Sequence, residues 1–245
     1  MNLAREGSFD IDQAAATPAR LEGMPAQGQA LSVRELEQRR LIHRNDSLRE
    51  HADAFRELRT KLLAMGAGAN VIQVSPIRHG CGGSFVARNL AAAFAFDESK
   101  SALLMDCDVR YPSQAAVFGI DSHAGGLVDY LEGGSLPLEA IVHPSGLPRL
   151  DVVPAGKRRE TVGEMFSSAR MRLMIDSLRD ALGQRFIILD GPPVEGSPDA
   201  RILSESADLV VLVAGQGEVT AEAVRKSVAA FTPEKMAGVV FNQRP

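Results

Sequence analysis

The chain has 245 residues, of which 45% are apolar and 24% charged, and a net charge of −4. That length supports one large α/β domain with a tail and is too short for two full-sized enzyme domains. The charge offers no overall attraction for nucleic acid, so any polyanion would have to bind locally. No run approaches the roughly 18 to 20 uncharged apolar residues of a membrane span, and no secretory leader opens the sequence, so we expect a cytoplasmic protein.

The N-terminal part of the chain is expected to contain a tail and two helices. Residues 1–30 are rich in Ala, Gln, Gly and Pro without periodicity, which predicts a flexible tail. Helices are expected over 32–45 and 47–66, the second ending at Gly66. The second helix carries its apolar residues at helical spacing: Leu48, Ala52, Phe55, Leu58 and Leu62.

From residue 67 onward, short β-branched runs alternate with amphipathic helices. Strands are expected over 70–75, 101–106, 149–153, 185–190, 208–214 and 238–242. The clearest helix is expected over 163–183, where one stripe holds Met171, Met174, Ile175, Leu178 and Leu182. This alternation predicts a doubly wound, mostly parallel α/β sheet flanked by helices, with ligands at the carboxyl ends of its strands.

We therefore divide the chain into three parts. Residues 1–30 are the flexible tail, residues 31–66 a helical segment for self-association or partner docking, and residues 67–245 the α/β domain. Charges of both signs alternate within the helical segment, which favours contact with a protein over contact with a membrane surface.

The stretch "VIQVSPIRHGCGGSFVARNLAAAFA", residues 71–95, has the outline of a phosphate-binding loop. Gly80, Gly82 and Gly83 would let backbone N–H groups turn toward phosphate oxygens, and Ser84 could offer its hydroxyl to Mg²⁺. The lysine of such loops is absent, because Gly83 stands in its place. A dinucleotide-binding turn is the competing interpretation, but Phe85 at its third glycine position would obstruct helix packing.

Carboxylates follow two further expected strands. Asp106 and Asp108 follow the second strand and Asp190 the fourth, so all three should meet the glycine-rich loop at one edge of the sheet. They are hard oxygen ligands suited to Mg²⁺. Asp190 alone could equally cap the turn before "GPP"; the order of the three segments favours a magnesium-triphosphate site.

Longer motifs carry a family resemblance over about residues 48–245. "LLMDCDVRYPS" is similar to the Walker A′ pattern LLIDxDxRxPS, "FIILDGPPV" to the Walker B pattern, and "DAFRELRTKLL" to the segment EAYRxLRTNL. The chain thus resembles the bacterial tyrosine kinases (BY-kinases) of the CpsD/CapB type. These are P-loop proteins of the deviant Walker class, and they accompany polysaccharide co-polymerases in capsule and exopolysaccharide export.

The resemblance implies a nucleotide site that uses ATP or ADP with Mg²⁺. Asp106 and Asp108 would be the catalytic Walker A′ pair if the protein is active. With Asp190 and Ser84 they would also hold the metal ion. Asn242 would contact adenine.

The resemblance also implies partners. Asp53, Arg56 and Arg59 match the acid and arginines that imply ring-type self-association. The expected partner is the cytoplasmic segment of a membrane co-polymerase of the Wzz type, which would hold this chain at the inner face of the plasma membrane. No nucleic acid is expected.

Departures from the family pattern point to weak or absent catalysis. Its loop reads roughly PGEGKST, so lysine is lost at Gly83 and threonine at Phe85. The sequence stops at "NQRP" after the last expected strand, so we expect the tyrosine-rich tail to be missing, leaving Tyr111 and Tyr130. The leading hypothesis is a pseudokinase that regulates or scaffolds polysaccharide export. The alternative is an active tyrosine kinase or ATPase in which Arg78 replaces the lysine, and a gain from Gly83→Lys would support the leading hypothesis.

Overall fold

The computed structural model describes residues 30–43, 49–66, 68, 70–121, 125–133, 135–180 and 185–243. The tail expected over 1–30 therefore lies outside the described residues apart from Ala30. The same holds for Leu48 and Leu182 of the two expected helix stripes.

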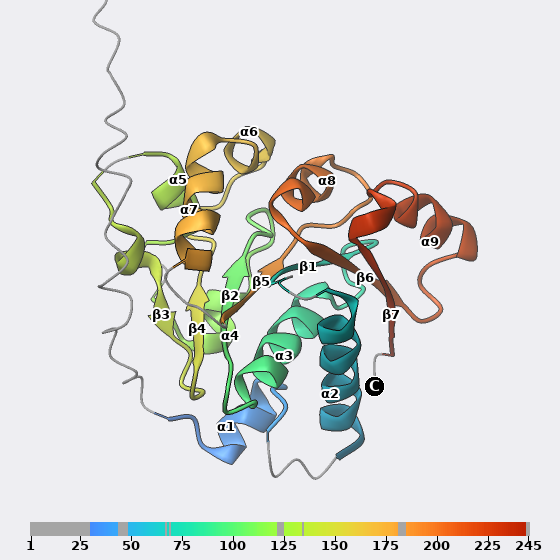
Figure 1. Cartoon of the computed structure of the whole chain (residues 1–245), viewed down its shortest axis with the longest axis horizontal. Coiled ribbons are helices and arrows are strands. Elements are labelled where there is room, and N and C mark those ends of the chain that lie inside the picture. The colour runs from blue at the N-terminus through green and yellow to red at the C-terminus, as the bar shows by residue number, and fades with distance from the viewer. Residues whose placement is uncertain are drawn as a thin grey trace, which may run out of the picture.

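A seven-stranded sheet runs through the centre of the fold in the order β3-β4-β2-β5-β1-β6-β7 (Figure 1). Neighbouring strands are parallel except β3, which pairs antiparallel with β4. The strands are β1 (Val71–Pro76), β2 (Ser101–Asp106), β3 (His143–Pro144), β4 (Leu150–Val153), β5 (Arg185–Asp190), β6 (Leu209–Gly215) and β7 (Met236–Asn242). The predicted doubly wound sheet is confirmed. Only β3 was not expected, because two residues carry no alternation.

Helices cover both faces of the sheet. One face is covered by α2 and α3, and the opposite face by α5, α7, α8 and α9 (Figure 1). The helices are α1 (Val33–Gln38), α2 (Arg49–Met65), α3 (Gly83–Ala95), α4 (Gln114–Phe118), α5 (Leu127–Leu131), α6 (Gly163–Phe166), α7 (Ala169–Asp180), α8 (Asp199–Leu203) and α9 (Ala221–Val228), with 3-10 turns η3 (Leu138–Ile141), η4 (Ser204–Ser206) and η5 (Pro233–Lys235).

Strand β5 shows why the strands are apolar on both faces. Phe186 and Ile188 belong to the core beneath α3, whereas Ile187 and Leu189 belong to the core beneath α7. The ring of Phe186 stacks on Phe94 of α3 at a centroid distance of 4.1 Å. Each fully buried aliphatic or aromatic side chain contributes about 1.5–3 kcal/mol, so successive residues of one strand stabilise opposite layers.

The N-terminal segment packs on α3 and forms a shorter first helix than expected. Ser32 caps α1 through a reciprocal bond with Glu35, but the helix expected over 32–45 ends at Gln38. Arg40 adopts a left-handed backbone (φ 53°), which ends the helix. The buried Asn89 of α3 holds the next turn: its amide donates to the Arg40 carbonyl at 3.0 Å, and its oxygen accepts from the Ile42 N–H at 2.8 Å.

The helix expected over 163–183 is divided into α6 and α7. The Ser168 hydroxyl accepts a hydrogen bond from the Met171 N–H at 3.1 Å, as a residue at a helix start does, and a new helix begins there. Met171 and the other described members of the predicted stripe are buried under the sheet: Met174, Ile175 and Leu178. Within the described ranges, no helix is long and apolar enough to cross a membrane.

Candidate functional site

Three loops meet at the carboxyl ends of three adjacent strands, β2, β5 and β1. Asp106 and Asp190 end β2 and β5, and they are paired partners in the strand register. The glycine loop follows β1 and leads into α3. The backbone of Gly191, next to Asp190, donates to the Val74 carbonyl of β1 at 2.8 Å. The sheet therefore brings together the three segments that the sequence had placed at one site.

The glycine loop is shaped by two left-handed glycines. Gly80 has φ 95° and Gly82 has φ 89°, a backbone region that residues with a side chain rarely adopt. Gly82 precedes the first turn of α3, where no side chain caps the helix. Asn242, at the end of β7, donates to the Cys81 carbonyl at 3.1 Å, and a Cβ at Gly82 would lie 2.1 Å from its amide nitrogen. Asn242 thus supports the loop from outside.

The position of the missing lysine is closed by a proline. A Cβ added at Gly83 would lie 2.5 Å from Pro76 Cδ and 2.9 Å from its Cγ. Pro76 is the last residue of β1, so the first turn of α3 approaches the strand end as closely as a glycine allows. Position 83 therefore has no room for any side chain unless Pro76 moves.

The carboxylates of Asp106 and Asp190 are buried, and neither forms an ion pair with a cation among the described residues, although the charge of Arg88 acts on Asp190. Asp106 is fully buried, and one of its oxygens accepts from the Ser113 and Gln114 N–H groups at 3.0 and 2.9 Å. Burial raises its pKa to about 7. Burial also raises the pKa of Asp190 well above its usual range, assisted by the charge of Asp106. The second oxygen of each carboxylate is buried and has no hydrogen-bond partner among the described residues.

Gln114 links these groups and was not expected from the sequence. Its side-chain amide donates to Asp190 Oδ2 at 2.6 Å and to the Ser84 carbonyl at 3.2 Å. The Ser84 hydroxyl in turn lies close enough to Asp190 to lower the pKa of that carboxyl. A glutamine after "YPS" carries no recognisable motif. Only the placement of α4 beside the glycine loop reveals its role.

Asp108 stands at the rim of this cluster. Burial raises its pKa, and one oxygen accepts from the Tyr111 N–H at 3.2 Å. The Tyr111 ring is half-exposed and lies against His79 of the glycine loop at a centroid distance of 4.4 Å. The guanidinium of Arg158 lies 5.4 Å from the same ring. An aromatic contact therefore joins the Walker A′ segment to the glycine loop.

These residues fit a magnesium ion. Two buried carboxylate oxygens without partners, together with the Ser84 hydroxyl, are the hard donors that Mg²⁺ takes, with phosphate and water completing its shell. A structural metal centre is not indicated. Within the described ranges, no three His, Cys, Asp or Glu side chains are grouped so that they could hold a metal ion by themselves. Asp106 and Asp190 would hold the ion, and bound Mg²⁺ would supply the charge that the buried acids lack.

Arg78 is engaged elsewhere. Its guanidinium pairs with Glu195 at 2.6 Å, on the loop that follows β5. The side chain is 51% exposed, and the Glu195 hydrogen bond raises the pKa of Arg78. For Arg78 to contact a phosphate, this ion pair would have to break.

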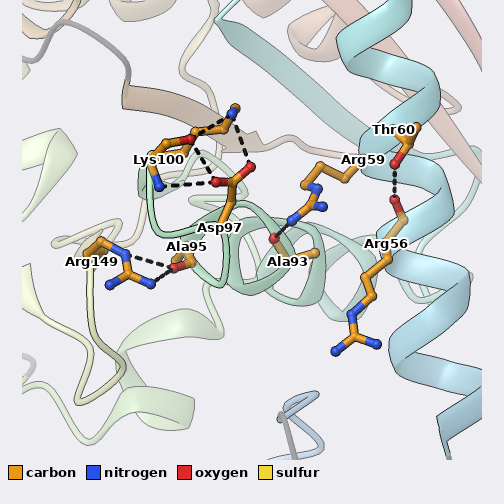
Figure 2. Close-up of polar contacts among 9 residues, drawn as sticks. Arg56, Arg59, Thr60, Ala93, Ala95, Asp97, Lys100 and Arg149 are labelled. Atoms are coloured by element: carbon orange, nitrogen blue, oxygen red, sulfur yellow. Dashed lines mark hydrogen bonds and ion pairs between the residues drawn. The ribbon is translucent and has the colours of Figure 1, made fainter.

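Two of the three residues expected to mediate self-association pair with each other. Asp53 and Arg56 form an exposed ion pair at 2.8 Å on α2. Arg59 instead reaches across to α3, where it donates to the Ala93 carbonyl at 2.8 Å (Figure 2). Arg149 donates to the neighbouring Ala95 carbonyl in the same way (Figure 2). Both arginines satisfy carbonyls at the C-terminal end of α3, which the helix itself leaves unpaired.

Both cysteines are free and buried. Burial raises the pKa of Cys107 well above its usual value, with the surrounding aspartates adding to the effect. A thiol with a raised pKa is a poor nucleophile, so a redox role for Cys107 is not favoured.

Comparisons with known proteins agree with this geometry, although no protein-family model matches the chain. The chain is 34% identical over 194 residues to a putative tyrosine-protein kinase EpsB of Ralstonia solanacearum. The aligned region covers 78% of this chain and 25% of EpsB. It is 28% identical over 191 residues to the tyrosine-protein kinase CpsD of Streptococcus agalactiae, covering 77% of this chain and 82% of CpsD. The chain thus spans a quarter of the first relative and most of the second.

Solved structures give the same answer. The chimerical protein CapA2B2 matches with a TM-score of 0.75 at 26% identity, over 94% of this chain and 100% of that chain. The kinase domain of VpsO matches with a TM-score of 0.70 at 29% identity, over 83% of this chain and 100% of that chain. The predicted P-loop architecture and family are confirmed. The chain belongs to the bacterial tyrosine kinase (BY-kinase) family.

Proposed function

We propose that this chain binds ATP or ADP with Mg²⁺ at the glycine loop and transfers phosphate slowly or not at all. On this proposal it is a pseudokinase of the family. The observation that carries the proposal is the contact between Gly83 and Pro76, which leaves no room for the lysine. The buried acids and the two left-handed glycines of an anion cradle are retained beside it.

The physical reason lies in the chemistry of phosphoryl transfer. Catalysis of this reaction rests on positioning and on neutralising the charge of the transferred group. Removing a single preorganised donor from such a site lowers the rate by about 10²–10³-fold, or about 3–4 kcal/mol. The acids and backbone groups that remain support nucleotide binding, which needs less charge complementarity than the transition state.

We further propose that the chain serves capsule or exopolysaccharide assembly as a regulator or scaffold. Its likeness to the kinases EpsB and CpsD supports this role, since the family motifs of the chain imply an export system. Residues 31–66 would dock on the cytoplasmic segment of a membrane co-polymerase of the Wzz type, at the inner face of the membrane. Asp53 and Arg56, exposed on α2, remain the candidates for self-association.

The alternative is an active kinase or ATPase in which Arg78 takes the place of the lysine. The ion pair with Glu195 weighs against it, because Arg78 would have to exchange a partner at 2.6 Å for the nucleotide.

Calorimetric titration of the purified chain with Mg-ATP and Mg-ADP, combined with transfer of radiolabelled phosphate, tests these proposals. We expect saturable binding that Asp190→Ala abolishes, and phosphate transfer at least about 10²-fold slower than that of a lysine-containing relative. Transfer at the rate of a lysine-containing relative, lost on Arg78→Ala, would establish the alternative. Absence of nucleotide binding would refute both.

A further inference from the structure

Arg158 lies between two residues whose backbones are fixed to neighbouring elements. On one side, the Lys157 N–H donates to the Asp129 carboxylate of α5 at 3.3 Å, and the Lys157 ammonium pairs with the same carboxylate at 3.2 Å. On the other side, the Arg159 N–H donates to the Val109 carbonyl at 3.3 Å. Val109 belongs to the Walker A′ segment, so these contacts hold the backbone of Arg158 beside that segment.

The Arg158 side chain extends over Tyr111, which links it to the glycine loop. Its guanidinium carbon lies 5.4 Å from the Tyr111 ring centroid. The same ring lies against His79 of the glycine loop at a centroid distance of 4.4 Å, and the Tyr111 N–H donates to Asp108 at 3.2 Å. Contact with an aromatic face steadies a guanidinium and leaves its N–H groups free to bind an anion. A single residue, Tyr111, thus stands between Arg158 and both the glycine loop and Asp108.

Arg158 has no acidic partner, unlike the basic residues around it. Those residues form ion pairs: Arg78 with Glu195, Arg110 with Glu160, and both Lys157 and Arg159 with Glu132. Arg158 is exposed, and none of the described carboxylates pairs with it. Arg88 forms no ion pair within the described ranges either, but its charge acts on Asp190 from α3. Unpaired arginines are ordinary on protein surfaces; this one is distinguished by its place beside a phosphate loop that has lost its lysine.

The order of the strands gives the direction in which a nucleotide would lie. Asn242, expected to contact adenine, ends β7 at one edge of the sheet, whereas the glycine loop follows β1 and the Walker A′ segment follows β2. Both β1 and β2 lie on the same side of β7, with β1 nearer to it. A nucleotide with its base at Asn242 and its phosphates on the glycine loop therefore points its last phosphate toward the Walker A′ segment, where Arg158 lies.

We propose that Arg158 binds the terminal phosphate of ATP and makes the site prefer ATP to ADP. This inference rests on the proposed function, since it requires a nucleotide at the glycine loop. The planar guanidinium matches two oxygens of a phosphate, and the terminal phosphate presents three. ADP ends one phosphate earlier, so it leaves Arg158 without that partner. The chain distinguishes the two nucleotides by binding alone, without transferring phosphate.

Calorimetric titration of the full chain with Mg-ADP and with Mg-AMP-PNP, an ATP analogue that resists hydrolysis, tests the proposal. We expect wild type to bind AMP-PNP more tightly than ADP. Arg158→Met should weaken AMP-PNP binding about tenfold, as the loss of one charged hydrogen-bonding partner does, and leave ADP binding within about twofold of wild type. Arg158→Lys should recover part of the loss. Arg225→Met, the same change at an exposed position on α9, should change neither affinity.

The difference between the two nucleotides separates direct contact from a structural role. If Arg158 only supported Tyr111 or the glycine loop, Arg158→Met would weaken the binding of ADP and AMP-PNP equally, and that result overturns the proposal. Equal AMP-PNP affinity in Arg158→Met and wild type also overturns it, and leaves the proposed function standing. If wild type binds neither nucleotide, the proposed function fails and this inference fails with it. Unchanged ADP affinity together with weakened AMP-PNP binding in Arg158→Met supports the proposal, and shows that the variant is folded.

Discussion

Replacing Gly83 by alanine adds one methyl group where α3 meets the end of β1. Its carbon would lie 2.5 Å from Pro76 Cδ, whereas carbon atoms in contact sit about 3.5–4.0 Å apart. The overlap of about 1 Å falls on a rigid ring in a central strand, and overpacking of this kind destabilises by about 1–3 kcal/mol. Alanine gains about 0.5–1 kcal/mol over glycine in a helix. We therefore expect a net loss of about 1–2 kcal/mol in the free energy of unfolding.

A double-mutant cycle isolates the contact. Urea unfolding followed by circular dichroism would compare wild type, Gly83→Ala, Pro76→Ala and the double variant. Pro76→Ala removes the ring carbons that the new methyl group meets, so the double variant should recover at least about 1 kcal/mol relative to the sum of the single changes. The reasoning is refuted if Gly83→Ala is as stable as wild type, or if the two changes are simply additive.

The same contact revises the expectation for lysine. Gly83→Lys was expected to restore some activity to a pseudokinase, but its Cβ would meet Pro76 before the amine reached any phosphate. We now expect Gly83→Lys alone to stay inactive in phosphate transfer, and Pro76→Ala combined with Gly83→Lys to gain activity. Equal gains in the single and double variants would show that Pro76 does not control this position.

Three further predictions concern the acids and α2. Without Mg²⁺ the free energy of unfolding should fall as pH rises from about 4 to 7, because the pKa of Asp106, raised from 3.8 to about 7, makes the folded form bind the proton more tightly. The slope is at most about 1.4 kcal/mol per pH unit for this group, and Asp106→Asn should flatten the profile; an unchanged slope contradicts the assignment. Gln114→Met should lower Mg²⁺-free stability by about 1–3 kcal/mol in urea unfolding, since Asp190 loses its donor at 2.6 Å; no loss would mean that water replaces it. Arg59→Ala should cost about 1–2 kcal/mol through the Ala93 carbonyl, and Arg56→Ala less than about 0.5 kcal/mol; equal losses in the same assay would disprove this distinction.

The strands and the meeting of the three loops could be predicted because they depend on local pattern and on topology. Each strand is a short apolar run, and a parallel sheet brings its carboxyl ends together. The sequence alone therefore predicts that Asp106 and Asp190 lie at one site, and the strand register agrees.

The features that could not be predicted depend on contacts between distant segments. Helix α1 ends at Gln38 because Asn89, far along the chain, holds the Arg40 turn. The contact of Pro76 with Gly83 depends on how closely α3 approaches β1, a distance that no spacing encodes. The role of Gln114 likewise depends on where α4 lies. Local patterns carry no information about such distances.

The contact between Pro76 and Gly83 also determines which replacements could give this chain a working lysine in the loop. With both residues present, no single replacement gives a lysine that fits the loop: a lysine at 83 meets the proline ring, and a change at Pro76 alone leaves the loop without its cation. A lysine that fits therefore takes two replacements, and making the change at Gly83 first gives a less stable chain. Packing of Pro76 against Gly83 thus keeps a lysine out of this position, in addition to the glycine having no side chain of its own.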